Sequence, residues 1–213
     1  MNISKLKQAE AEFLHRYPGG FDNPEIIATR NKKHKPDQMI AFAQESFSKR
    51  NFKLPEQIVQ NMVKIVSRSS IISVFEKQRF RDFVNEFPPP TKNLLAHGLE
   101  ESLHGQEQTG FEIILELLKD GKLAKWSLMT VCQTYFHPQR DVFIKPTTVK
   151  GIIEYFELKD LQYKPTPSWA FYEAYRYTFH EMKSKVDKSL SPTNPAFSGF
   201  LLMTIRGKLF YSM

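Results

Sequence analysis

The chain has 213 residues, of which 41% are hydrophobic and 25% are charged. This composition is ordinary for a globular protein, and the length suffices to bury a sizeable core. The single cysteine excludes an internal disulfide, and no apolar run is long enough to span a bilayer. The first residues lack the apolar stretch of a signal peptide, so we expect a cytoplasmic protein with no membrane partner.

The net charge is +7. This charge is compatible with an anionic partner such as DNA or RNA. The alternative is that the charge serves only solubility, as it does in many proteins.

In the first part of the chain, apolar residues recur every three or four positions, which is the period of an amphipathic helix. This pattern predicts four helices, at about residues 3–17, 39–47, 55–66 and 71–87. Pro18, Gly19 and Gly20 end the first of them. The stretch that follows, 21–36, is polar, and no helix is predicted there.

Three consecutive prolines, Pro88, Pro89 and Pro90, form the clearest break in the chain. Polyproline is stiff and extended. We therefore expect a single helical domain over residues 1–213, in which the prolines separate two sub-lobes, 1–87 and 91–213.

Helical spacing continues after the prolines. Thr91 is the predicted cap of the next helix, and Thr109 with Glu112 has the spacing of a capping box that opens another. Four more helices are predicted, at about residues 123–135, 147–156, 169–186 and 197–205. The segment 141–146 is the one short strand predicted. The fold class is therefore all-α, a compact domain of about ten helices with at most one short strand.

Two Glu-x-x-His pairs, Glu12–His15 and Glu101–His104, have the spacing that builds di-metal sites in helical bundles. A helical wheel places both pairs opposite the apolar face of their helices. We therefore expect them to face solvent, and the sequence predicts no metal and no cofactor.

Cys132 lies late in a helix among apolar residues, where a cysteine usually packs rather than reacts. Phosphate-binding loops, nucleophile elbows and zinc-spaced cysteines are absent from the sequence. The chain therefore favours a non-enzymatic function, and no catalytic residue is predicted.

Basic residues are densest in Arg30 to Lys35, a run that is either a contact for nucleic acid or lipid, or a solvated loop. Basic and aromatic residues alternate between 122 and 183, where they could neutralise phosphates and stack on bases. The predicted phosphate contacts are Lys145, Lys150, Lys164 and Arg176, and the predicted stacking residues are Trp169 and Tyr172. The alternative is that Trp169 and Tyr172 close the core against the helix at 147–157.

Part of this segment resembles a family of uncharacterised bacterial proteins, over roughly residues 122–180. The resemblance rests on the spacing of Trp126, Thr130, Phe143, Lys145, Pro146, Lys150, Tyr163, Pro165, Pro167, Trp169 and Tyr172. It implies a bacterial domain and no particular activity.

The leading hypothesis is a non-enzymatic module that binds DNA or RNA through these basic groups. The second is a protein–protein interaction or regulatory subunit, which would show an exposed apolar patch. The third is an enzyme of unrecognised type, which would show a deep pocket with convergent polar groups. The sequence predicts no oligomeric state.

Overall fold

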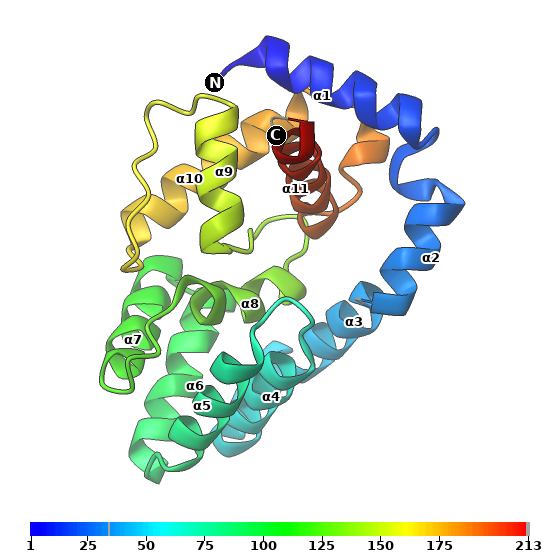
Figure 1. Ribbon diagram of the computed structural model, residues 1–213. Coiled ribbons are helices and arrows are strands. Elements are labelled where there is room, and N and C mark those ends of the chain that lie inside the picture. The colour runs from blue at the N-terminus through cyan, green and yellow to red at the C-terminus, as the bar shows by residue number, and fades with distance from the viewer. Residues whose placement is uncertain (34, 212–213) are drawn as a thin grey trace.

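The computed structural model describes residues 1–33 and 35–211 (Figure 1). Eleven α-helices and three short 3₁₀ helices lie in that part of the chain, and it contains no strand. The helices are α1 (Ile3–Arg16), η1 (Gly20–Asp22), α2 (Pro24–Lys33), α3 (Pro36–Ser46), η2 (Lys49–Lys53), α4 (Pro55–Arg68), α5 (Val74–Asn85), α6 (Pro89–His104), α7 (Glu107–Lys119), α8 (Trp126–Phe136), α9 (Pro146–Tyr155), α10 (Trp169–Ser184), η3 (Lys188–Leu190) and α11 (Asn194–Tyr211). The all-α prediction is confirmed, and the strand predicted at 141–146 is wrong.

Helix α2 occupies the polar stretch in which no helix was predicted. Its only large apolar residues are Ile26 and Ile27, too few to give a periodic signal. The start of the helix has local signals instead. The Asn23 side chain accepts a hydrogen bond from the Glu25 N–H at 3.0 Å, and Pro24 is the first helical residue.

Two predicted helix starts differ from the structure. Helix α6 begins at Pro89 rather than after a Thr91 cap, because proline fits the first turn, where no N–H partner is needed. Helix α7 begins at Glu107, so Thr109 lies inside its first turn and does not cap it.

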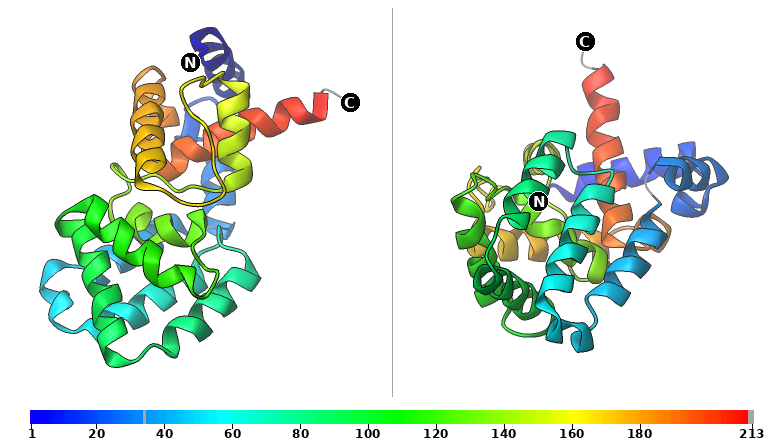
Figure 2. Two further views of the ribbon diagram at one scale, coloured as in Figure 1. Left: turned by 90° about the vertical axis from the view of Figure 1, so that its left-hand side faces the viewer. Right: turned by 90° about the horizontal axis from the view of Figure 1, so that it is seen from below.

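The helices form two groups, with α8 between them (Figures 1 and 2). One group contains α3 to α7, in which α4 packs against α3, α5 and α6, and α6 packs against α7. The other contains α1, α9, α10 and α11, with α1 and α9 both against α11. Each group therefore combines helices from both sides of the three prolines. One cluster of buried residues, from Leu6 to Leu201, runs through both groups.

Helices α6 and α7 approach each other unusually closely. A Cβ atom added at Gly110 of α7 would overlap with backbone atoms of Gly98 and Ser102 in α6. Glycine therefore allows α7 to lie directly on α6, which places Glu107 beside Ser102 at the edge of the polar network described below.

Within residues 1–33 and 35–211, no helix has both the length and the apolar character needed to cross a membrane.

Candidate nucleic-acid interface

The six predicted nucleic-acid contacts lie in two separate places. Lys145, Lys150 and Lys164 are exposed around the first turns of α8 and α9. The other three residues, Trp169, Tyr172 and Arg176, lie on the side of α10 that faces α7. The six residues therefore do not share one exposed face.

Tyr172 is 3% exposed, and its ring stacks on Phe111 of α7 with 5.9 Å between centroids. Trp169 is half-buried and meets the same Phe111 edge to face at 5.8 Å. Because Tyr172 is covered on this side, its ring has no free face for a base. The two aromatics do close the core, but against α7 rather than against the helix at 147–157.

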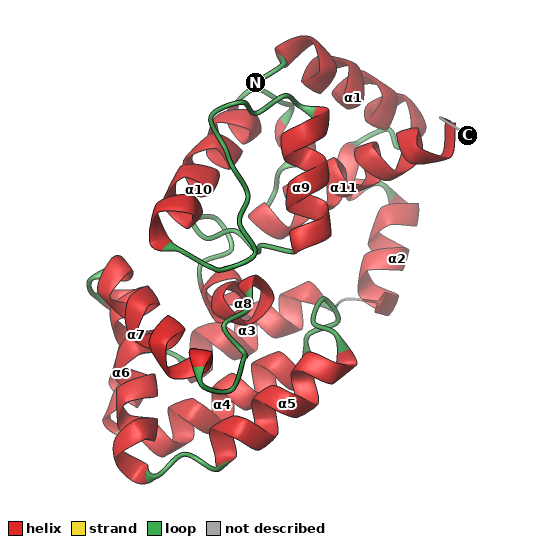
Figure 3. Cartoon of the chain, turned by 60° about the vertical axis from the view of Figure 1, so that its left-hand side comes forward, coloured by secondary structure: helices red, strands yellow, loops and turns green. Residues whose placement is uncertain are grey.

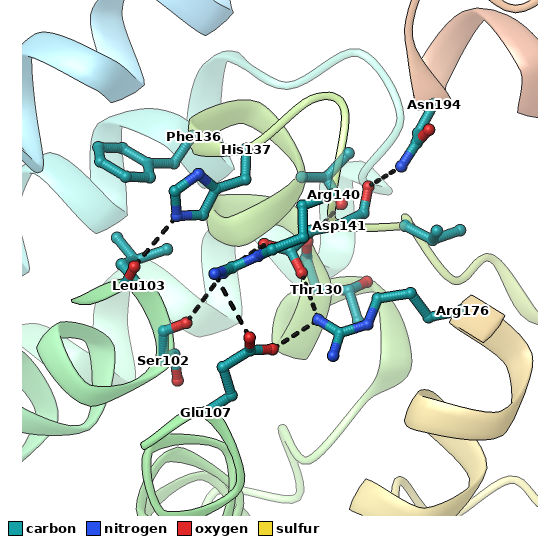
Figure 4. A network of polar contacts seen from close by, with 12 residues as sticks. Ser102, Leu103, Glu107, Thr130, Phe136, His137, Arg140, Asp141, Arg176 and Asn194 are labelled. Carbon is teal, nitrogen blue, oxygen red and sulfur yellow. Dashed lines mark hydrogen bonds and ion pairs between the residues drawn. The ribbon is translucent and has the colours of Figure 1, made fainter. Parts of the chain in front are cut away.

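Arg176 is held in a buried network of ions (Figure 4). The carboxylate of Asp141 is buried and accepts hydrogen bonds from Arg176 and Arg140, both at 2.9 Å, and from the Tyr172 hydroxyl at 3.1 Å. Glu107 pairs with Arg176 as well, and lies 3.4 Å from Arg140. Two carboxylates thus neutralise two guanidinium groups, and Arg176 is not available to a phosphate.

Burial and the neighbouring charges shift the pKa values of Tyr172 and Arg176. Burial raises the pKa of Tyr172 well above its ordinary value, and the negative charge of Asp141 adds to the rise. For Arg176, burial lowers the pKa, but the hydrogen bond to Glu107 and the neighbouring negative charges raise it more, so the net direction is upward. Arg176 therefore stays charged and Tyr172 stays neutral, as the network requires.

The same network connects five parts of the chain. Asn194, at the start of α11, donates to the carbonyl oxygen of Asp141 at 3.1 Å. Nε2 of His180 in α10 lies 2.8 Å from the carbonyl oxygen of Arg140. Nε2 of His137, after α8, lies 3.0 Å from the carbonyl oxygen of Leu103 in α6. With Glu107 on α7, these contacts fix the connection between α8 and α9 to the surrounding helices.

Beside the network lies a cavity of about 10 Å³. Its lining includes the carboxylates of Glu107 and Asp141 and the side chain of Gln133. This volume is about that of one water molecule. The network therefore holds the surrounding helices together, and the cavity beside it is too small for a substrate.

The Glu-x-x-His pairs differ in their surroundings. Glu12 and His15 are exposed, as predicted. His104 is half-buried, with Nε2 2.8 Å from the Phe47 carbonyl oxygen and its ring between Phe52 and Phe136, so the prediction that it faces solvent is wrong. The helical wheel considers one apolar face, whereas η2 and the end of α8 cover a second face of α6, on which His104 lies. In the described part of the chain, no three His, Cys, Asp or Glu side chains gather as a metal site would require.

Cys132 is 3% exposed, which confirms the prediction of a buried cysteine. Burial raises the pKa of its thiol to about 12. The thiolate, which is the reactive form, is therefore scarce at neutral pH.

Four exposed lysines, Lys125, Lys145, Lys150 and Lys164, form what we call the basic surface. Lys125 immediately precedes α8, Lys145 immediately precedes α9, and Lys150 is one turn further along α9. Lys164 lies in the loop between α9 and α10, which runs across the outside of the molecule toward α8 (Figures 2 and 3).

Specific contacts bring these segments together. The indole Nε1 of Trp126, next to Lys125, donates to the Lys164 carbonyl oxygen at 2.8 Å. One turn along α8, Thr130 Oγ1 accepts from the Ile144 N–H at 3.1 Å, which places Lys145 beside α8. Lys150 Nζ lies 5.1 Å from the ring centre of Tyr163. These contacts hold together the three chain segments that carry the four lysines.

None of the four lysines forms an ion pair with a carboxylate in residues 1–33 and 35–211. Glu76 reaches the start of α8, but it caps α5 through Ser73 and accepts a hydrogen bond from Ser127. No side chain caps the first turn of α8 or α9. The partial positive charge of these helix starts adds to that of the lysines.

Two members of this site were not among the predicted contacts, namely Lys125 and Tyr163. Both were visible as part of the alternating basic and aromatic pattern between 122 and 183.

In the basic run at Arg30 to Lys35, Arg30 pairs with Asp37 at 3.1 Å, and Lys32 and Lys35 are exposed. His34 lies outside the described residues.

Comparisons of the chain with protein-family models, with curated proteins and with solved structures found no match. The resemblance of residues 122–180 to uncharacterised bacterial proteins therefore stays a prediction.

Proposed function

We propose that the protein is a non-enzymatic module that binds nucleic acid through the basic surface. Lys145, Lys150 and Lys164, joined by Lys125, contact backbone phosphates. The observation that carries this proposal is that three chain segments held together by specific contacts carry four exposed lysines, none of which forms an ion pair in the described part of the chain.

None of these four lysines has a carboxylate at ion-pair distance among the described residues. Exposed Lys7 and Lys119 do pair with carboxylates, whereas exposed Lys49 and Lys53 of η2 do not. Unpaired like charges held close together repel each other, and a polyanion relieves that repulsion. Binding a phosphate chain also releases its condensed counterions, which is the main source of sequence-independent affinity.

The buried network supports a non-enzymatic reading of the same region. Its arginines and carboxylates neutralise one another, and the cavity beside them holds about one water. The arginines of the segment 122–183 are thus paired with carboxylates, whereas the four lysines of the basic surface are exposed and form no ion pair among the described residues, so the lysines can meet a large ligand.

The test is the salt dependence of binding. The protein should bind oligonucleotides at about 50 mM salt, and log Kobs should fall linearly with log salt concentration. The variant Lys145→Ala/Lys150→Ala/Lys164→Ala should bind all sequences more weakly, and its slope should be smaller by about one unit for each phosphate that a lysine no longer neutralises.

The chain offers a matched control in η2, which packs against α4 and α6. Lys49, Arg50 and Lys53 line a shallow depression there, are exposed, and form no ion pair in the described part of the chain. The variant Lys49→Ala/Arg50→Ala/Lys53→Ala removes the same three charges and should leave binding nearly unchanged. If the control loses affinity and the first variant does not, the basic surface is not the binding site.

A protein–protein interaction is the second candidate, and one observation favours it. Val74 and Phe75, at the start of α5, are 74% and 83% exposed. Water-exposed aromatic side chains are enriched at interfaces. Should the wild-type protein bind neither DNA nor RNA at about 50 mM salt, this reading replaces the first. Sedimentation of wild type and Phe75→Ser over a range of concentrations would test whether this pair mediates self-association.

A further inference from the structure

We infer that the preferred ligand of the basic surface is single-stranded nucleic acid, with one unpaired base stacked on Tyr163. This inference rests on the proposed function and specifies its substrate class. It comes from the position of Tyr163, whose ring lies under the Lys150 ammonium and whose neighbour in sequence is Lys164.

Tyr163 is half-buried, and its ring meets Phe171 of α10 edge to face, with 5.8 Å between centroids. Its hydroxyl forms no hydrogen bond with the residues that the structure describes. Lys150 lies over its ring, 5.1 Å from the centre. The ring therefore packs on Phe171 of the core, and the exposed, flexible side chain of Lys150 lies over it.

The support beneath Tyr163 is rigid. The carbonyl oxygen of the next residue, Lys164, accepts the hydrogen bond from Trp126, one of the most deeply buried side chains. Phe171, which supports the tyrosine, also packs on Trp126 at 5.3 Å. Pro167 further along the loop is buried. A ring fixed in this way loses little entropy when a base stacks on it.

The chemistry distinguishes single strands from duplexes. A base can take the place of the Lys150 ammonium over the ring, and the displaced ammonium can then contact the adjacent phosphate. In a duplex both faces of each base are already stacked, so only an unpaired base can make this contact. The arrangement of cation, aromatic ring and cation is typical of proteins that bind single strands by stacking and charge together.

The experiment compares fluorescence anisotropy of a single-stranded oligonucleotide of about 12 nucleotides with that of a blunt-ended duplex formed by the same strand and its complement. Single strands should bind about tenfold more tightly. Tyr163→Leu should lower single-strand affinity about 5-fold to 150-fold, which corresponds to one stacked base, and should leave duplex affinity unchanged. Tyr163→Phe is the matched control, since it keeps the ring and should bind as wild type does.

A second variant protects the test against a folding defect. Tyr163→Trp keeps an aromatic ring at the site, and its added fluorescence should be quenched by single strands but not by the duplex. Equal binding of both oligonucleotides, with Tyr163→Leu neutral and no quenching in Tyr163→Trp, would overturn the inference and leave the proposed function intact. Absence of all binding in the wild-type protein would overturn both.

Discussion

Replacing Asp141 by alanine should destabilise the protein more than any exposed charge substitution. The Asp141 carboxylate accepts hydrogen bonds from Arg140, Arg176 and the Tyr172 hydroxyl in a buried site. Without it, two guanidinium groups share the one remaining carboxylate, Glu107. Removing one partner of a buried ion pair costs about 3–5 kcal/mol. For a chain of this length, that loss lowers Tm by roughly 6–20 °C in a thermal scan.

The control is Asp82→Ala, because Asp82 also follows an arginine and also pairs with it at 2.9 Å. The two aspartates differ in burial, with side chains 51% exposed for Asp82 and 2% for Asp141. An exposed pair is worth about 0.2–1 kcal/mol, so Asp82→Ala should change Tm by no more than a few degrees. If the two variants melt at the same temperature, the buried network does not stabilise the fold.

Three further predictions address other parts of the structure. Because burial raises the pKa of Cys132 to about 12, its thiol should stay unmodified by a thiol-reactive disulfide at about pH 8 until denaturant is added. Burial lowers the pKa of His137, so the unfolded chain binds the proton more tightly, and unfolding free energy should fall as the pH drops below about 6.5. Urea titrations of His137→Gln should show a smaller fall over that range. Gly110→Ala should destabilise by at least about 1–3 kcal/mol, because its Cβ would overlap with α6, whereas Gly207→Ala, with nothing within 4 Å of the added Cβ, should not lower Tm.

The fold class followed from sequence wherever a helix has a wide apolar stripe, as α4 does with six buried apolar residues. The prediction failed at α2, which is held by local caps and by the neighbouring η1 rather than by such a stripe. At 141–146, a short apolar run, Val142 to Ile144, suggested a strand. There the N–H groups of Val142 and Ile144 bond to the side chains of Tyr172 and Thr130 instead of to another strand. A short apolar run indicates burial, and side chains can satisfy the hydrogen bonds of the buried backbone as a neighbouring strand would.

At the candidate site, the sequence indicated the segment 122–183 but not which of its residues face solvent. Trp169, Tyr172 and Arg176 have helical spacing and lie on one side of α10. Whether that side faces solvent or another helix depends on α7, some 60 residues away in sequence, whose Glu107 and Phe111 cover it. Likewise, no local pattern shows that Trp126 reaches Lys164. Contacts of this kind are tertiary, and periodicity carries no information about them.

The division of cations between interior and surface follows the chemistry of the two basic side chains. Arg140 and Arg176, the two arginines between 122 and 183, are the network's cations, where a planar guanidinium can serve more than one carboxylate and remain charged. Lysine carries a compact charge on a flexible side chain, and the four lysines of the basic surface are exposed to solvent. The segment 137–145 joins the two regions, because Arg140 and Asp141 fix its start while Ile144 fixes Lys145 beside α8. The buried ions thus hold the loop that carries part of the basic surface. Because lysine contacts phosphate as a point charge, the surface suits a ligand recognised by its charge and by stacking rather than by its sequence.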